Sequence, residues 1–299
     1  MNNFYAALPS IRPPFLLLAP ICVCFGASIA AYLQMPFNTL HFILAILGAF
    51  LAGIAVNTLN EYQDNQSGLD LITEKTPFSG GSGLLGKHPE LASTVIKITF
   101  ISTLLLFFIG CYFCYVVGVE VAYLGLFGLA IIGLYTKWLN KIPFACLIAP
   151  GLGFGVLIPL GSYWVITDSS TVNDIVWQLT FIPFLLINNL LLLNQYPDIK
   201  ADKTAGRNHI VIKYGVNTAN YIYFISALLT AVLIVVLYLY YQLPVAFLLS
   251  LLPCSLSFIS FGGMVLYKEN IALQPRFMVM NVVSANATPV VIALALSST

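Results

Sequence analysis

Charge is scarce in this chain. Asp, Glu, Lys and Arg make up 8% of its 299 residues, whereas roughly 25% is usual for a soluble domain. Hydrophobic residues make up 60%, and the mean hydropathy is +0.94. The net charge of +1 gives no support to nucleic-acid binding, which requires a basic surface. The composition therefore predicts an integral protein of the lipid bilayer.

A cleavable signal peptide is also lacking. The first apolar run follows Arg12-Pro13-Pro14 and has no convincing small-residue cleavage site. Runs of about 20 apolar residues can cross ~30 Å of hydrocarbon as helices, which satisfy their own backbone groups. The sequence predicts an all-α polytopic fold with nine transmembrane helices, or eight if the short fourth run does not cross. The predicted spans are 15–33, 40–58, 95–117, 121–136, 144–166, 176–193, 221–241, 245–267 and 277–296.

One predicted membrane face lacks basic residues. With a cytoplasmic N-terminus, all 12 Lys and Arg residues fall on one face, and the connections 33–39, 117–121, 167–175 and 241–245 contain none. Basic residues are retained in short cytoplasmic loops. We therefore expect the N-terminus and the longer polar connections to be cytoplasmic, and the C-terminus to lie across the membrane.

Two acidic motifs follow hydrophobic spans on the basic face. They are Asn60-x3-Asp64 after the second span and Asn194-x3-Asp198-x3-Asp202 after the sixth. Side chains four residues apart share a helix face, and we expect Pro197 to kink the second of these helices. Because the motif recurs four spans later, we predict two pseudo-repeats plus a ninth helix in one domain, 1–299. Cytoplasmic cap loops are expected at 58–94 and 194–220, with a site between the repeats.

The oxygen atoms of both motifs are predicted to form one anionic cup. Neighbouring carboxylates are difficult to ionise together unless a cation lies between them. Mg²⁺ prefers carboxylate and amide oxygens as ligands and shares its other coordination positions with substrate phosphates. Basic residues stand beside the acids at Lys75, Lys200, Lys203 and Arg207. The glycines in 79–83 allow backbone N–H groups to approach phosphate oxygens, or simply form a turn. The cup therefore favours binding of a diphosphate. Cations beside it would stabilise the negative charge of the diphosphate as it leaves.

The spans and motifs together resemble the UbiA superfamily of intramembrane prenyltransferases, over essentially the whole chain. The second motif fits the family pattern fully. The first, read as Asn60-x3-Asp64-x5-Asp70, is similar to the longer form in the MenA-like branch, which prenylates 1,4-dihydroxy-2-naphthoate in the menaquinone pathway. The family's usual Tyr-x3-Lys motif after the fourth span is replaced here by Tyr135 with Lys137 and Lys141.

The resemblance implies Mg²⁺-dependent transfer of a polyprenyl group from a prenyl diphosphate to an aromatic acceptor in a bacterial inner membrane. Two Mg²⁺ ions are expected, one at each motif. The implied metal ligands are Asn60, Asp64, Asp70, Asn194, Asp198 and Asp202, with Asp64, Asp198 and Asp202 serving catalysis. The implied substrate contacts are Lys75, Lys203 and Arg207, with Tyr135, Lys137 and Lys141 as further candidates.

Two other functions stay open at this level. A UbiA-type terpene cyclase would ionise the same diphosphate and let the cation close on its own chain. A cation-coupled transporter also uses repeats and intramembrane acids. The transporter is the weaker alternative, because these acids lie at span ends on one face rather than near mid-span.

Overall fold

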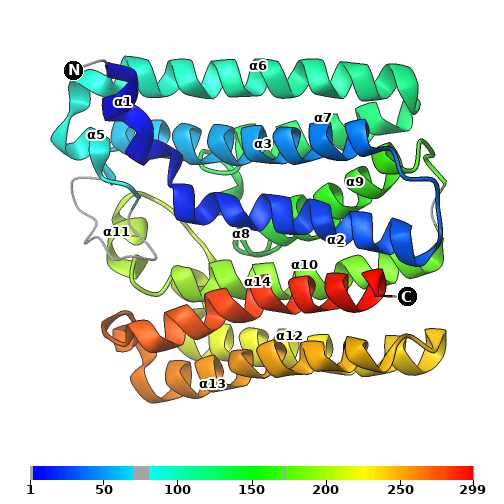
Figure 1. Cartoon of the computed structure of the whole chain (residues 1–299). Helices are drawn as coiled ribbons and strands as arrows, with labels where there is room; N and C mark the ends of the chain where they lie inside the picture. The colour runs from blue at the N-terminus through cyan, green and yellow to red at the C-terminus, as the bar shows by residue number, and fades with distance from the viewer. Residues whose placement is uncertain (1–2, 70–80, 172, 299) are drawn as a thin grey trace.

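The computed structural model describes residues 3–69, 81–171 and 173–298. This part of the chain contains helices and no strands, which confirms the predicted all-α class. The long helices lie side by side along a common direction (Figure 1). Their bounds are α2 (Leu18–Tyr32), α3 (Thr39–Gln66), α6 (Ala92–Val116), α7 (Glu120–Leu134), α8 (Pro143–Pro150), α9 (Ile158–Ile166), α10 (Asp174–Asn194), α12 (Ile210–Tyr241), α13 (Leu251–Tyr267) and α14 (Pro275–Ser297).

Eight helical stretches among the described residues are long and apolar enough to cross a membrane. α7 is a shorter apolar helix of 15 residues, which rise only about 22 Å at 1.5 Å per residue. Large apolar side chains such as Tyr115, Tyr240 and Leu266 are exposed on the outside, as lipid-facing residues are. The prediction of a polytopic membrane protein is confirmed. The count of nine spans depends on α7 and is not confirmed.

Three short helices gather at one end of the bundle. α1 (Asn3–Ala7), α5 (Leu84–Lys87) and α11 (Ile199–Thr204) lie at this end with the N-terminus, and the C-terminus lies at the opposite end (Figure 1). We call this the cap end. Its cytoplasmic location remains a prediction from charge.

The cap loops are more helical than the sequence suggested. α3 continues to Gln66, so that the first motif is still part of a helix, and α12 already begins at Ile210. Gly215 interrupts α12 with a φ of 81°, a left-handed conformation that glycine adopts without steric cost. The end of the predicted cap loop 194–220 therefore belongs to one long helix that is kinked at Gly215.

Two glycines bring the middle of the fifth predicted span against α10. This span runs from Pro143 to Ile166 and contains the π-helical segment η5 (Gly151–Leu157). A Cβ atom added at Gly151 would lie 2.5 Å from the Phe184 carbonyl oxygen, and one at Gly155 would lie 2.4 Å from the Phe184 nitrogen. Small residues permit this close backbone approach between membrane helices. The contact fixes α10, and with it the second motif, against the wall of the bundle.

The Gly155→Ala variant is therefore expected to be destabilised by about 1–3 kcal/mol or more, the usual cost of overpacking. The atoms in the way belong to the backbone of α10 and cannot rotate aside, so the helices must separate. Thermal unfolding in detergent should show a lower midpoint. Gly153→Ala is the matched control, because a Cβ at Gly153 would meet no atom within 4 Å. Equal midpoints for the two variants would show that the close contact is not needed.

Candidate active site

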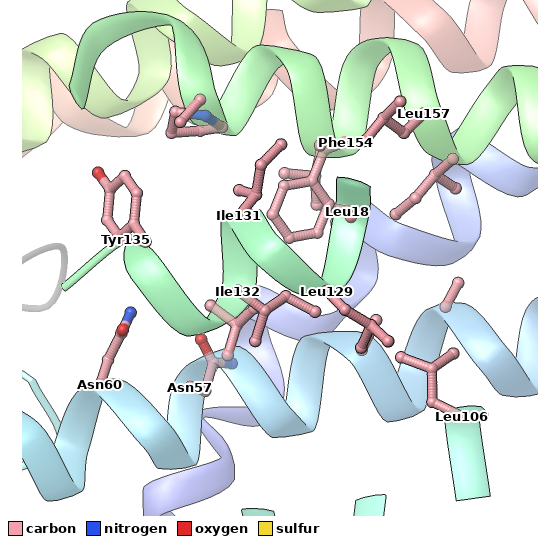
Figure 2. A pocket seen from close by; sticks show the side chains of 18 of the residues that line it. Leu18, Asn57, Asn60, Leu106, Leu129, Ile131, Ile132, Tyr135, Phe154 and Leu157 are labelled. Carbon is pink, nitrogen blue, oxygen red and sulfur yellow. The ribbon is translucent and has the colours of Figure 1, made fainter. Parts of the chain in front are cut away.

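A cavity of about 670 Å³ opens at the cap end and runs into the bundle between α3, α7, η5 and α10. Its cap end is polar, and its deeper walls are apolar. Figure 2 shows Asn57, Asn60 and Tyr135 at the polar end and Ile131, Leu129 and Phe154 farther in. The cavity thus joins a polar chamber to a long apolar channel, which suits a ligand with one charged end and one apolar end.

The first motif contributes two described residues to the polar end. Asn60 and Asp64 lie one turn apart near the end of α3, and both line the cavity. The Thr136 hydroxyl, which follows α7, donates a hydrogen bond to Asn60 Oδ1. Asp70 lies outside the described residues.

The second motif does not form one continuous helix. α10 ends at Asn194, and α11 begins at Ile199 after a turn that contains Pro197. The predicted kink was therefore wrong: proline cannot donate a backbone hydrogen bond, and the helix stops here. Asn194, Asp198 and Asp202 nevertheless all line the cavity, because the turn and the short helix fold back over its polar end.

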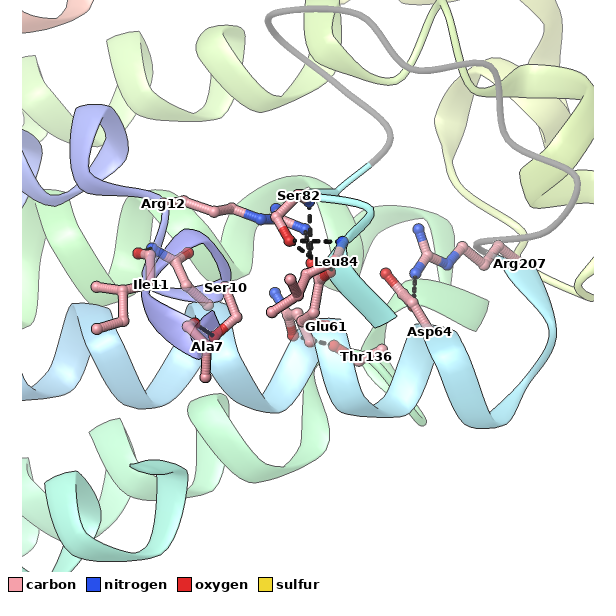
Figure 3. A network of polar contacts seen from close by, with 12 residues as sticks. Ala7, Ser10, Ile11, Arg12, Glu61, Asp64, Ser82, Leu84, Thr136 and Arg207 are labelled. Atoms are coloured by element: carbon pink, nitrogen blue, oxygen red, sulfur yellow. Dashed lines mark hydrogen bonds and ion pairs between the residues drawn. The ribbon is translucent and has the colours of Figure 1, made fainter. Parts of the chain in front are cut away.

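Arg207 joins the two motifs. Its Nη2 pairs with Asp64 Oδ1, and its Nη1 donates to Asp202 Oδ1 at 2.9 Å (Figure 3 shows the first contact). Burial opposes the charge of Arg207, but the two carboxylates outweigh it and raise the pKa of the guanidinium. His209 Nε2 lies 3.3 Å from Asp202 Oδ2. The structure therefore brings α3 and α11 together through one cation that the sequence had assigned to the diphosphate.

The polar end is chemically suited to Mg²⁺. No group of three His, Cys, Asp or Glu side chains in the described ranges is close enough to hold a metal by itself. Mg²⁺, however, is often bound by one or two carboxylates, with waters and substrate phosphates completing the shell. Asn194 Oδ1 is buried and has no hydrogen-bond partner among the described residues, which leaves an amide oxygen available. Three carboxylates line this end together with two arginines, Arg12 and Arg207, and Arg12 also pairs with Glu61, so additional positive charge would be stabilising.

The predicted basic contacts divide into two groups. Lys137, Lys141 and Lys203 are exposed and are not among the residues that line the cavity, and Lys75 lies outside the described residues. Tyr135 does line it, with its hydroxyl 3.7 Å from Cys146 Sγ. A phenol hydroxyl can donate a hydrogen bond to an anion at the polar end of the cavity.

Sequence analysis gave no role to Glu61, which the structure places at the centre of a hydrogen-bond network (Figure 3). Its fully buried carboxylate accepts from the Ser82 nitrogen at 2.9 Å, the Ser82 hydroxyl at 2.5 Å and the Leu84 nitrogen at 3.1 Å. Within the described part of the glycine segment, the Ser82 backbone N–H thus donates to Glu61. The available signal was the charge itself, because a buried acid at a span end requires partners.

Other unassigned residues also line the polar end. They are Arg12, Asn57, Thr136, Asn140, Gln195 and His209. All but Gln195 lie outside the two motifs. No local spacing pattern marks them, because only the folded chain brings these segments together.

Known proteins share both the sequence pattern and the fold. Two relatives named 1,4-dihydroxy-2-naphthoate octaprenyltransferase are 29% identical over 208 residues (Bacillus subtilis, strain 168) and 28% identical over 232 residues (Escherichia coli, strain K12). The alignments cover 68% and 74% of this chain, and 64% and 72% of the relatives. The B. subtilis match therefore spans less than two thirds of that relative's own length.

Two solved structures have the same fold. A digeranylgeranylglyceryl phosphate synthase superposes with a TM-score of 0.69 at 16% identity over all of both chains. A UbiA homologue from Archaeoglobus fulgidus, bound to DMAPP and Mg²⁺, gives 0.66 at 14% identity over 98% of this chain and 99% of that chain. A model of the UbiA prenyltransferase family matches residues 17–284. The predicted resemblance is confirmed, and this chain belongs to the UbiA prenyltransferase family.

Proposed function

We propose that this protein transfers a polyprenyl group from a prenyl diphosphate to 1,4-dihydroxy-2-naphthoate or a closely similar aromatic acceptor, with Mg²⁺ as cofactor. The observation that carries the proposal is a cavity whose polar end is lined by both acidic motifs and whose remaining walls are apolar. The diphosphate would occupy the polar end, and the isoprenoid tail would lie in the channel.

The acceptor and cofactor rest on the comparisons. Both curated relatives are named for 1,4-dihydroxy-2-naphthoate and an octaprenyl group, and the A. fulgidus homologue was solved with DMAPP or GPP and Mg²⁺. The first motif of this chain is also of the longer, MenA-like form. A role in menaquinone synthesis and a bacterial inner membrane location are part of the same proposal.

The residues of the polar end have separate tasks in this scheme. Asn60 and Asp64 would hold one Mg²⁺, with Asp70 completing the first motif. Asn194, Asp198 and Asp202 would hold the other. When bound, Mg²⁺ would supply positive charge that stabilises the departing diphosphate.

The surroundings of the metal ligands support the same chemistry. Arg207 keeps Asp64 and Asp202 close together and would share them with a metal. Tyr135 offers a protonated hydroxyl beside the reacting end. The apolar channel walls exclude water, so the allylic cation formed when the C1–O bond breaks would be captured by the acceptor rather than hydrolysed.

We expect the purified protein to form a prenylated naphthoate and release diphosphate only when Mg²⁺ is present. EDTA should abolish the reaction and added Mg²⁺ should restore it, because the carboxylates alone would repel the diphosphate. The measurement is product mass with a panel of prenyl diphosphates, with and without 1,4-dihydroxy-2-naphthoate or 4-hydroxybenzoate. A cyclic hydrocarbon formed without acceptor would indicate a terpene cyclase instead. Cation uptake into vesicles with no diphosphate release would indicate a transporter.

A further inference from the structure

Gln195 lies where the polar end of the cavity meets the apolar channel. It caps the end of α10, and its backbone nitrogen donates to the Leu191 carbonyl oxygen at 3.2 Å. On this helix the channel is lined by Ile187, Leu190 and Leu191, and the polar end by Asn194 and Gln195. A ligand group bound by Gln195 would therefore lie beside the entrance to the channel.

The nitrogen of the Gln195 amide is used by the protein. Nε2 donates to Cys146 Sγ at 3.3 Å, and the same sulfur lies 3.7 Å from the Tyr135 hydroxyl. Cys146 and Tyr135 also line the cavity. Because Cys146 belongs to α8 and Gln195 follows α10, the contact joins two helices and holds the amide in one orientation.

The oxygen of the same amide is not used in this way. Gln195 is 7% exposed, and its Oε1 is buried with no hydrogen-bond partner among the described residues. An amide oxygen is an acceptor with two lone pairs, and leaving a buried acceptor unpaired is unfavourable. The position therefore favours a ligand that can donate a hydrogen bond.

The proposed substrates differ in their ability to donate one. An ionised diphosphate and an ionised carboxylate only accept hydrogen bonds, and an isoprenoid tail has no polar hydrogen. The acceptor 1,4-dihydroxy-2-naphthoate carries two hydroxyl groups. The 1-hydroxyl lies next to the carboxylate and donates to it within the molecule, so the 4-hydroxyl is the group that is free to donate to the protein.

We propose that Gln195 determines specificity for the aromatic acceptor, with its Oε1 accepting a hydrogen bond from the ring hydroxyl that lies away from the carboxylate. The apolar ring would then rest beside Leu191 at the channel entrance. A site built to pair with a substrate hydroxyl rejects analogues that lack it, because its own polar atom stays unpaired. This inference rests on the proposed function for the identity of the acceptor.

Binding measurements test the inference without requiring catalysis. The full-length protein in detergent, with Mg²⁺, would be dialysed to equilibrium against 4-hydroxy-2-naphthoate, 2-naphthoate or inorganic diphosphate. The two naphthoates differ by one hydroxyl that cannot reach the carboxylate. The unmodified protein is expected to prefer 4-hydroxy-2-naphthoate. Gln195→Met keeps the length of the side chain and should weaken that ligand by about 3–10-fold, the size of one neutral hydrogen bond, with 2-naphthoate and diphosphate unchanged.

Two further variants complete the binding test. Gln178→Met is the matched control, because Gln178 lies on the same helix and does not line the cavity, so the preference for the hydroxyl should stay. Cys146→Ala removes the partner of Gln195 Nε2 and leaves Oε1 in place. It should reduce the preference by a smaller factor, and it tests the inference if Gln195→Met does not fold.

Steady-state kinetics give a second readout if the protein turns over. Gln195→Met should raise KM for 1,4-dihydroxy-2-naphthoate and leave KM for the prenyl diphosphate unchanged. General loss of structure would not produce this split.

A folded Gln195→Met variant that keeps the full preference for 4-hydroxy-2-naphthoate overturns the inference. So does an equal loss of diphosphate binding, which would make Gln195 part of the metal site instead. Failure of the proposed function is a different result: the preference for the hydroxyl depends on Gln195, but no prenylated product forms with any donor.

Discussion

The Asp198→Asn and Asp64→Asn variants are each expected to lose at least about 100-fold in Mg²⁺-dependent diphosphate release, comparable to removing one essential electrostatic contact from an active site. Each substitution keeps the size of the side chain but removes a negative charge from the polar end of the cavity. Both residues line that end, from different segments. Losing either one should therefore weaken the hold on one metal and raise the barrier to ionisation of the donor.

The Asp64→Asn variant has a second expected effect. Asp64 also pairs with Arg207, so that Asp64→Asn perturbs the link between α3 and α11 as well. Asp168→Asn is a matched control at the opposite end of the bundle, where Asp168 contacts His41. Diphosphate release should be followed with unfolding midpoints for all three variants. Wild-type turnover in Asp198→Asn or Asp64→Asn would remove that residue from the site.

The Gly153→Phe variant is expected to change which donors the enzyme accepts. The cavity follows α3 from Asp64 to Leu44, a rise of about 30 Å at 1.5 Å per residue. Gly153 lines this channel, and a Cβ there would meet nothing within 4 Å. A phenyl group would therefore enter the channel itself. With long polyprenyl diphosphates, kcat/KM should fall about 10–100-fold, because overpacking costs about 1–3 kcal/mol and each 1.4 kcal/mol is tenfold.

Short donors provide the internal control for this prediction. Dimethylallyl diphosphate should react with Gly153→Phe nearly as well as with the unmodified protein, because its tail ends before the obstruction. Gly262→Phe makes the same substitution on α13, away from the cavity. An equal loss for short and long donors would mean that the tail does not lie along this channel, and no loss for either would mean the same.

The acidic motifs are the part of the site that could be predicted from the sequence. The spacing of Asn60 and Asp64 predicted a shared helix face, and both residues line the cavity. The same spacing was misleading around Pro197, where the helix ends and the chain turns. Asp198 and Asp202 still line the cavity after this turn. The residues of the motif therefore lie together although they are not on one continuous helix.

The basic residues of the site were harder to predict from the sequence. Lys203 was a candidate because it is near the acids in sequence, and Lys137 because the family resemblance implies a lysine after the fourth span, yet both side chains are exposed. Arg12 was not a candidate, although it reaches the cavity from the other end of the chain. Nearness in sequence does not fix the direction of a long side chain, which depends on the packing of the segments around it.

The amino-acid sequence was enough to establish the membrane class, the helical fold and the two oxygen-rich motifs. Each follows from local quantities: apolar run length, the need to satisfy backbone groups in lipid, and residue spacing. The folded chain was needed to show that Arg207 bridges the motifs, that Glu61 binds the Ser82–Leu84 segment and that Arg12 pairs with Glu61 beside the cavity. Those contacts join residues 143, 21 and 49 positions apart, and the packing of the whole bundle determines which distant side chains meet.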